Sequence, residues 1–87
     1  MYNRQGKYKE AEELYKKALE IRVRVLGGNH PATASSYNNL GVLYDEQGKY
    51  KEAEELYKKA LTIRARTLGE DHPETAAIRN RILTMNR

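Results

Sequence analysis

The chain has 87 residues, of which 39% are hydrophobic and 32% charged, with a formal net charge of +4. This balance is typical of a folded helical domain and argues against a disordered tail. The absence of cysteine excludes a disulfide framework and a thiolate zinc site, and no apolar run approaches the roughly 18 residues of a membrane span. Because residues 2–13 are polar throughout, we expect no signal peptide, and we predict a cytoplasmic protein with no membrane partner.

Most of the charge is balanced locally. Four glutamates each precede a lysine by four residues, the order that favours ion pairs on a solvated helix surface. These pairs are Glu12–Lys16, Glu13–Lys17, Glu54–Lys58 and Glu55–Lys59. The excess arginines Arg22, Arg24, Arg64 and Arg66 fall near the ends of the helices predicted below, where cations complement the helix dipole. We therefore do not expect a nucleic-acid partner, although a basic helical nucleic-acid binder stays open as a third hypothesis.

An internal repeat organises the chain. Residues 5–19, QGKYKEAEELYKKAL, recur unchanged at residues 47–61, an offset of 42 residues. Because one amphipathic hairpin cannot bury its apolar face alone, such units stack on their neighbours and share a core. The repeat predicts an all-α array that forms a single domain over residues 1–87.

The predicted elements follow from this repeat in chain order. Residues 1–6 are the remnant of a first helix, and four helical segments follow at 7–27, 28–48, 49–69 and 70–87. Apolar residues recur at three- and four-residue spacing in each unit, which indicates amphipathic helices. Gly48 suits the left-handed position that ends a helix, and Pro31 and Pro73 suit a first turn. The result is about five antiparallel helices, the first of them truncated.

These residues resemble the tetratricopeptide repeat family. Its pattern W-x2-L-G-x2-Y followed by A-x3-F is met by Tyr37, Leu40, Gly41, Tyr44, Ala53 and Tyr57, with tyrosine in place of Trp and Phe. The repeat is 42 residues long where the family's usual length is 34, and in this it is similar to kinesin light chain repeats. The resemblance implies a right-handed solenoid fragment that serves as a non-catalytic scaffold for binding protein.

No catalytic or metal-binding motif appears. His30 and His72 occupy equivalent positions in successive repeats, each before a proline, which fits a capping or loop role better than a metal pair or a triad. Phosphate-binding loops, HExxH and nucleophile elbows are absent from the sequence. We therefore predict no enzyme activity, no metal and no cofactor.

The family resemblance implies a peptide-binding groove lined by the first helix of each repeat. The candidate groove residues are Ser35, Asn38, Asn39, Val42, Asp45, Glu46, Asn80 and Arg81. An asparagine amide both donates and accepts, so Asn38 is suited to pair with the backbone of an extended peptide. Arg81 stands where the preceding repeat has Asn39, and its charge favours an acidic or C-terminal carboxylate ligand.

The two ends of the array predict self-association. We expect exposed apolar stripes on helix 7–27 and on helix 70–87, and such stripes seek partners. The residues concerned are Ala11, Leu14, Tyr15 and Ala18 at one end and Ile78, Ile82 and Leu83 at the other. Two homo-oligomers would satisfy both ends: a head-to-tail stack, which is slightly favoured, and a domain-swapped dimer. The alternative is a structural or engineered repeat unit with no ligand of its own.

Overall fold

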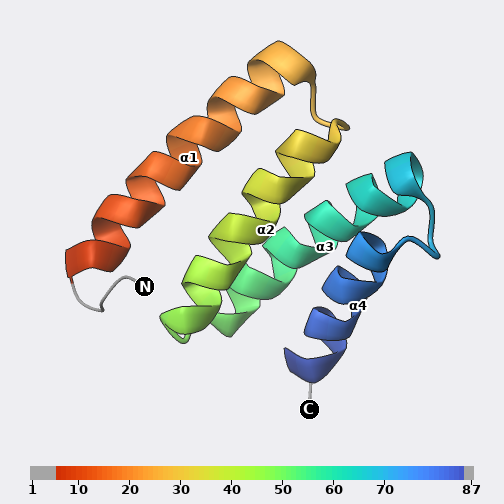
Figure 1. Cartoon of the computed structure of the whole chain (residues 1–87). Coiled ribbons are helices and arrows are strands. Elements are labelled where there is room, and N and C mark those ends of the chain that lie inside the picture. The colour runs from red at the N-terminus through yellow and green to blue at the C-terminus, as the bar shows by residue number, and fades with distance from the viewer. Residues whose placement is uncertain (1–5, 86–87) are drawn as a thin grey trace.

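The computed structural model describes residues 6–85, which form four α-helices. These are α1 (Gly6–Leu26), α2 (Pro31–Glu46), α3 (Tyr50–Leu68) and α4 (Pro73–Met85). Successive helices run antiparallel, and each packs on the next along the chain (Figure 1). The predicted all-α repeat fold is confirmed. Of the predicted remnant at 1–6, residues 1–5 lie outside the described residues and Gly6 begins α1.

Local sequence sets where the helices begin and end. His30 caps α2, its Nδ1 accepting a hydrogen bond from the Ala32 N–H at 3.0 Å, and His72 accepts from the Glu74 N–H at 3.1 Å. Each histidine is followed by a proline at the first helical position, which has no N–H to leave unpaired. After α2, Gly48 adopts φ +83°, the left-handed conformation that ends a helix at low cost to glycine. Of the two expected roles, capping or loop, both histidines therefore have the capping one.

The core lies where α2 and α4 pack on α3. Its fully or nearly buried members are Ala34, Ala53, Tyr57, Ala60, Ile63, Ile78 and Ile82. At its centre Gly41 of α2 lies against the Tyr57 ring, so closely that a Cβ at residue 41 would come within 2.6 Å of a ring carbon. The missing side chain at Gly41 therefore allows α2 and α3 to approach each other and bury the whole tyrosine.

The prediction that Ile78 and Ile82 are uncovered is wrong. Only 5% of Ile78 and 8% of Ile82 is exposed, because these side chains face α3 and belong to the core. Ala11 is also buried, since α1 packs on α2. Leu83, by contrast, is 61% exposed. The apolar stripe of α4 is thus mostly used inside the molecule.

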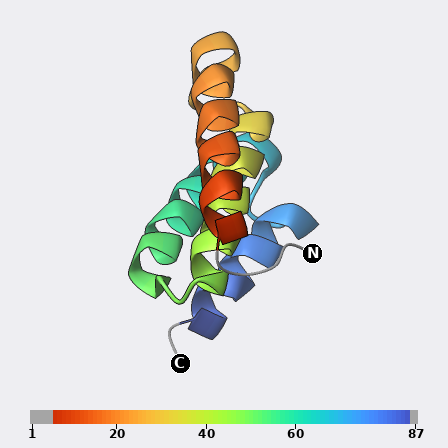
Figure 2. The ribbon, with the colours of Figure 1, turned by 90° about the vertical axis from the view of Figure 1, so that its left-hand side faces the viewer.

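Helices α1 and α3 share a sequence but differ in their surroundings. Helix α3 lies between α2 and α4, whereas α1 packs mainly on α2. Viewed from the α1 side in Figure 2, α1 stands in front of the other three helices. As a result Ile21 is 55% exposed while its repeat equivalent Ile63 is 5% exposed. One face of α1 is therefore only partly covered by the described residues, and we call it the outer face of α1. In it Leu14 and Ile21 are exposed, while Tyr15, Ala18 and Arg22 are half-buried.

Candidate functional site

A small cleft opens between α2 and α4, with α3 beneath it. We call it the α2–α4 cleft, and its volume is about 140 Å³. It is lined by Asn38 from α2, Arg64 from α3, and Glu74, Ala77, Ile78 and Arg81 from α4. Small-molecule sites usually enclose about 300–1,000 Å³, so this cleft has room for a single side chain rather than a whole ligand.

Arg64 forms the floor of the cleft and ties three helices together. Its Nη2 donates to Ser35 Oγ of α2 at 2.6 Å, and its Nη1 is ion-paired with the Glu74 carboxylate of α4. Only 8% of the residue is exposed, and this burial lowers the pKa of the guanidinium from its ordinary value. Within residues 6–85 its buried Nε has no hydrogen-bond partner. The guanidinium thus retains one unused donor beside the cleft.

Asn38 and Arg81 complete the polar lining. The Oδ1 of Asn38 is buried, and the described part of the chain offers it no hydrogen-bond donor. Arg81 is exposed, and its guanidinium carbon lies 5.5 Å from the centroid of the Tyr57 ring. Burial raises the pKa of the Tyr57 hydroxyl, and the positive charge of Arg81 offsets part of this increase in the pKa. The lining of the cleft therefore includes both a cation and an amide whose oxygen has no partner among the described residues.

The structure brings some of the predicted groove residues together and leaves others apart. Asn38 and Arg81 line the cleft, and Ser35 lies behind it through its bond to Arg64. Val42 packs against the core and Asp45 is half-buried, whereas Asn39, Glu46 and Asn80 are exposed and do not line the cleft.

The cleft residues missed by the groove prediction are Arg64, Glu74 and Ala77; Ile78 was assigned instead to self-association. Arg64 was interpreted as a cation near a helix C-terminus. Its repeat equivalent Arg22 also donates to another helix, to Ala32 O at 3.0 Å and to Ser36 Oγ at 3.1 Å. The recurrence of arginine at this repeat position was therefore the sequence signal that could have indicated a bond between helices.

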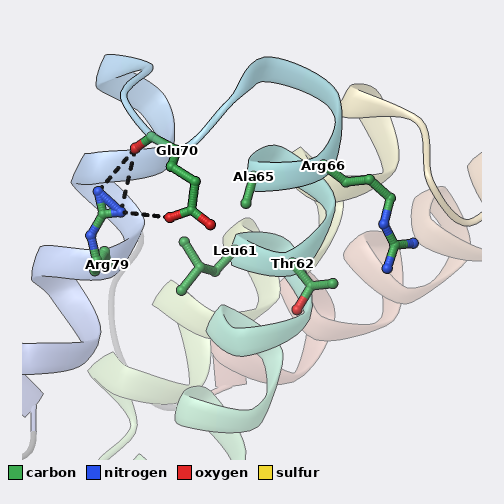
Figure 3. A pocket seen from close by; sticks show the side chains of 6 residues that line it. All are labelled: Leu61, Thr62, Ala65, Arg66, Glu70 and Arg79. Atoms are coloured by element: carbon green, nitrogen blue, oxygen red, sulfur yellow. Dashed lines mark hydrogen bonds and ion pairs between the residues drawn. The ribbon is translucent and has the colours of Figure 1, made fainter.

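A larger pocket of about 460 Å³ lies on another side of α3. It is lined by Leu61, Thr62, Ala65, Arg66, Glu70 and Arg79 (Figure 3). Arg79 bonds to the Glu70 carbonyl oxygen at 3.0 Å, and Figure 3 shows this pair at the edge of the pocket with Arg66 turned away from it. Arg66 instead donates to Asn29 Oδ1 at 3.1 Å. The polar side chains of this pocket are thus already used within the described structure: both arginines bond to loop residues, the Glu70 carboxylate pairs with Arg79, and the Thr62 hydroxyl donates to Lys58 O of its own helix.

Two other classes of site, metal centres and membrane spans, are absent from the described residues. Residues 6–85 contain no cluster of three or more histidine, cysteine or acidic side chains arranged to hold a metal ion. Among the described helices, none combines the length and the apolar character that crossing a membrane requires.

Comparison with known proteins identifies the family. The sequence model of the family described as Tetratricopeptide repeat matches residues 1–66 and again residues 46–86, so the chain belongs to this family. Its members are typically non-catalytic modules that bind other proteins. A segment of 37 residues, 42% of the chain, is 54% identical to a nucleotide-binding leucine-rich repeat (NLR)-like protein of Hyaloscypha variabilis. The match spans 4% of the length of that relative.

Proposed function

We propose that this chain is a non-catalytic protein-interaction module whose α2–α4 cleft takes one residue of an extended peptide. The buried Asn38 Oδ1, which has no partner among the described residues, is the observation that carries the proposal. A buried polar atom without a partner costs about 1–3 kcal/mol, and a peptide N–H in the cleft would remove that cost once the Asn38 side chain turns its oxygen toward it. Peptide binding is also the role that members of the family commonly have.

The charges of the cleft favour an acidic ligand. The carboxylate of Glu74 is already paired with Arg64, so the exposed guanidinium of Arg81 is the charge left to act on a ligand. Arginine binds carboxylates through paired N–H donors, and such charge-assisted hydrogen bonds are among the stronger ones. We propose an aspartate, a glutamate or a C-terminal carboxylate as the residue that enters.

The test is a screen of random short peptides against the chain, followed by affinity measurements on the selected sequences. Asn38→Ala is expected to weaken binding about fivefold to tenfold, the loss of one hydrogen bond. Asn80→Ala is the matched control, because Asn80 is the repeat equivalent of Asn38 but is exposed and does not line the cleft. Equal effects of the two substitutions, or no selected peptide at all, would contradict the proposal.

The screen also separates the alternatives. A structural or engineered repeat unit with no ligand of its own would select no peptide. A nucleic-acid binder would bind mixed-sequence DNA with an affinity that falls steeply as salt rises. Cytoplasmic location remains a prediction from composition.

A second candidate function is association with other polypeptides through the outer face of α1. Leu14 is 66% exposed and Ile21 is 55% exposed on this one helix. Two such neighbouring apolar side chains favour a packing partner. The α4 half of the predicted self-association lacks this support, since Leu83 is the only one of its three residues that is exposed.

A further inference from the structure

The chain contains a template for what covers the outer face of α1. Residues 8–19 of α1 repeat residues 50–61 of α3 without change, and α3 has α2 packed on it. The same side chains are therefore seen twice, once with a covering helix and once without. Leu56, Tyr57, Ala60, Ile63 and Arg64 of α3 correspond to the five residues of the outer face of α1.

Three contacts define how α2 sits on α3. Gly41 lies against the Tyr57 ring. The Ser35 hydroxyl accepts the Arg64 Nη2 bond at 2.6 Å. The ring of Tyr37 lies beneath the ammonium group of Lys59, with 5.6 Å between Nζ and the ring centroid. A covering helix thus carries serine, tyrosine and glycine at the spacing of residues 35, 37 and 41.

The matching groups on α1 are all present. Tyr15 is the equivalent of Tyr57 and is half-buried where Tyr57 is fully buried, and Lys17, the equivalent of Lys59, is exposed. Arg22, the equivalent of Arg64, makes both of its bonds to α2 through Nη1. Its Nη2 is the equivalent of the atom with which Arg64 reaches Ser35, and within residues 6–85 no bond occupies it.

We propose that the outer face of α1 binds an amphipathic helix from another polypeptide that carries the α2 pattern, serine, tyrosine and glycine at S-x-Y-x3-G spacing. The glycine faces Tyr15, the tyrosine lies beneath Lys17, and the serine accepts from Arg22 Nη2. Binding then covers Leu14 and Ile21 as their equivalents are covered in α3, where Leu56 is half-buried and Ile63 is 5% exposed.

Helix α4 of a second copy does not fit this face. At the positions of Ser35, Tyr37 and Gly41 it carries Ala77, Arg79 and Leu83. Alanine offers no acceptor to Arg22, arginine places a like charge against Lys17, and leucine occupies space that Tyr15 fills. A domain swap at residues 47–49 re-forms the same α2–α3 contact between two chains and leaves the outer face of α1 uncovered. In head-to-tail stacking, the slightly favoured prediction, α4 of one copy would contact the outer face of α1 of the next. The side chains of these two surfaces are therefore poorly complementary.

The experiment uses the full chain, labelled with ¹⁵N, and a synthetic peptide of residues 30–47 that reproduces α2 with its histidine cap. Titration should shift amide signals of α1 and leave those of α3 in place. A peptide with Gly41→Leu is expected to bind at least about tenfold more weakly, because the added side chain meets Tyr15. A peptide of residues 72–85, which reproduces α4, should fail to bind.

Matched variants of the chain locate the site. Ile21→Lys should weaken peptide binding at least about tenfold by removing an apolar contact. Val25→Lys should leave it unchanged, because Val25 is 69% exposed and its equivalent Thr67 is exposed in α3, which has α2 packed on it. Either variant alters an exposed residue, so the fold should persist, which circular dichroism checks.

Three results would overturn the proposal. Shifts centred on α3 would mean that the peptide displaces the chain's own α2. Equal loss from Ile21→Lys and Val25→Lys would indicate non-specific apolar binding. Shifts of α1 that grow with chain concentration in the absence of peptide would assign the face to a second copy.

Discussion

At Gly41 the backbone of α2 runs directly against the ring of Tyr57. Glycine in a helix interior costs about 1 kcal/mol relative to alanine, so propensity alone would select against it. The close contact with a fully buried ring explains its presence. Packing here outweighs the intrinsic preference of the helix.

Replacing Gly41 with alanine should therefore destabilise the chain. The helix gains about 1 kcal/mol of propensity, but the new Cβ at 2.6 Å from the ring forces Tyr57 or α2 to move, and overpacking typically costs about 1–3 kcal/mol. We expect a net loss in the free energy of unfolding, measured by urea denaturation. Gly28→Ala is the control, because no atom lies within 4 Å of a Cβ there. An increase in stability for Gly41→Ala would show that the contact is looser than described.

His30 should contribute through its cap. Its replacement by alanine leaves the Ala32 N–H without its side-chain partner and should cost about 1 kcal/mol. Asparagine, which accepts from the same position, should restore most of that stability. Thermal unfolding of the unmodified chain, His30→Ala and His30→Asn in one buffer provides the test. If His30 contributed only by packing, the smaller asparagine side chain would not restore the stability.

Residue roles were predictable from sequence where they depend on neighbours in the chain. The caps at His30 and His72 and the turn at Gly48 follow from dipeptides and helix periodicity. The role of Arg64 does not, because its partners Ser35 and Glu74 lie on two other helices and become neighbours only after packing. Likewise the spacing of Ile78 and Ile82 predicts a stripe on α4 but not that α3 covers it.

At the scale of elements, a short polar network joins α1 to α2. Tyr44 donates to Glu12 Oε2 at 2.8 Å, and Lys16 Nζ lies 3.0 Å from the same oxygen. Burial raises the pKa of the Glu12 carboxyl, but these hydrogen bonds outweigh it and leave the pKa below its ordinary value. Of the four predicted Glu–Lys pairs, this one and Glu54–Lys58, at 3.3 Å, are formed in the described structure.

This network predicts a pH dependence of stability. Because the folded pKa of Glu12 is depressed, its contribution is complete above the ordinary value of 4.5 and is lost as the pH falls through the folded pKa. Tyr44→Phe should lower the free energy of unfolding by about 1 kcal/mol at pH 7 and flatten its decline below pH 4.5. Urea titrations between pH 7 and pH 3 provide the measurement, with Tyr50→Phe, at a 60% exposed residue, as control. If the free energy of unfolding fell with pH in parallel for Tyr44→Phe and the unmodified chain, the Tyr44–Glu12 hydrogen bond would not be the cause of the pH dependence.

At the scale of the whole molecule, the two ends of the array are unlike. The outer face of α1 keeps the pattern found on α3, whereas α4 has replaced three positions of the α2 pattern. Repeat length and the tyrosine and glycine positions predicted the array itself, because they recur within the chain. Which end accepts a further helix was not predictable from periodicity, since it depends on close contacts such as that of Gly41 with Tyr57.

Restoring two of the three positions of the α2 pattern on α4, and leaving Arg79 in place, should create stacking. In the double variant Ala77→Ser and Leu83→Gly, α4 regains the hydroxyl for Arg22 and the space for Tyr15 of a second copy. We expect its mass in sedimentation equilibrium to rise continuously with concentration above 10.1 kDa, because a head-to-tail contact does not close. The unmodified chain should show no such open-ended rise. A continuous rise in the mass of the unmodified chain would contradict this, because it would mean that Leu83 of one copy packs against Tyr15 of the next without a clash.

The shared sequence of α1 and α3 also makes the molecule its own reference for backbone dynamics. The intrinsic rate of amide exchange depends on neighbouring side chains, and these are the same for residues 9–18 and 51–60. Any difference in protection between the two segments therefore isolates the effect of being flanked on two sides instead of one. The ratio of deuterium uptake in residues 9–18 to that in residues 51–60 would report the fraction of chains with a helix bound to the outer face of α1. It would do so in any mixture, with no label and no second protein as a standard.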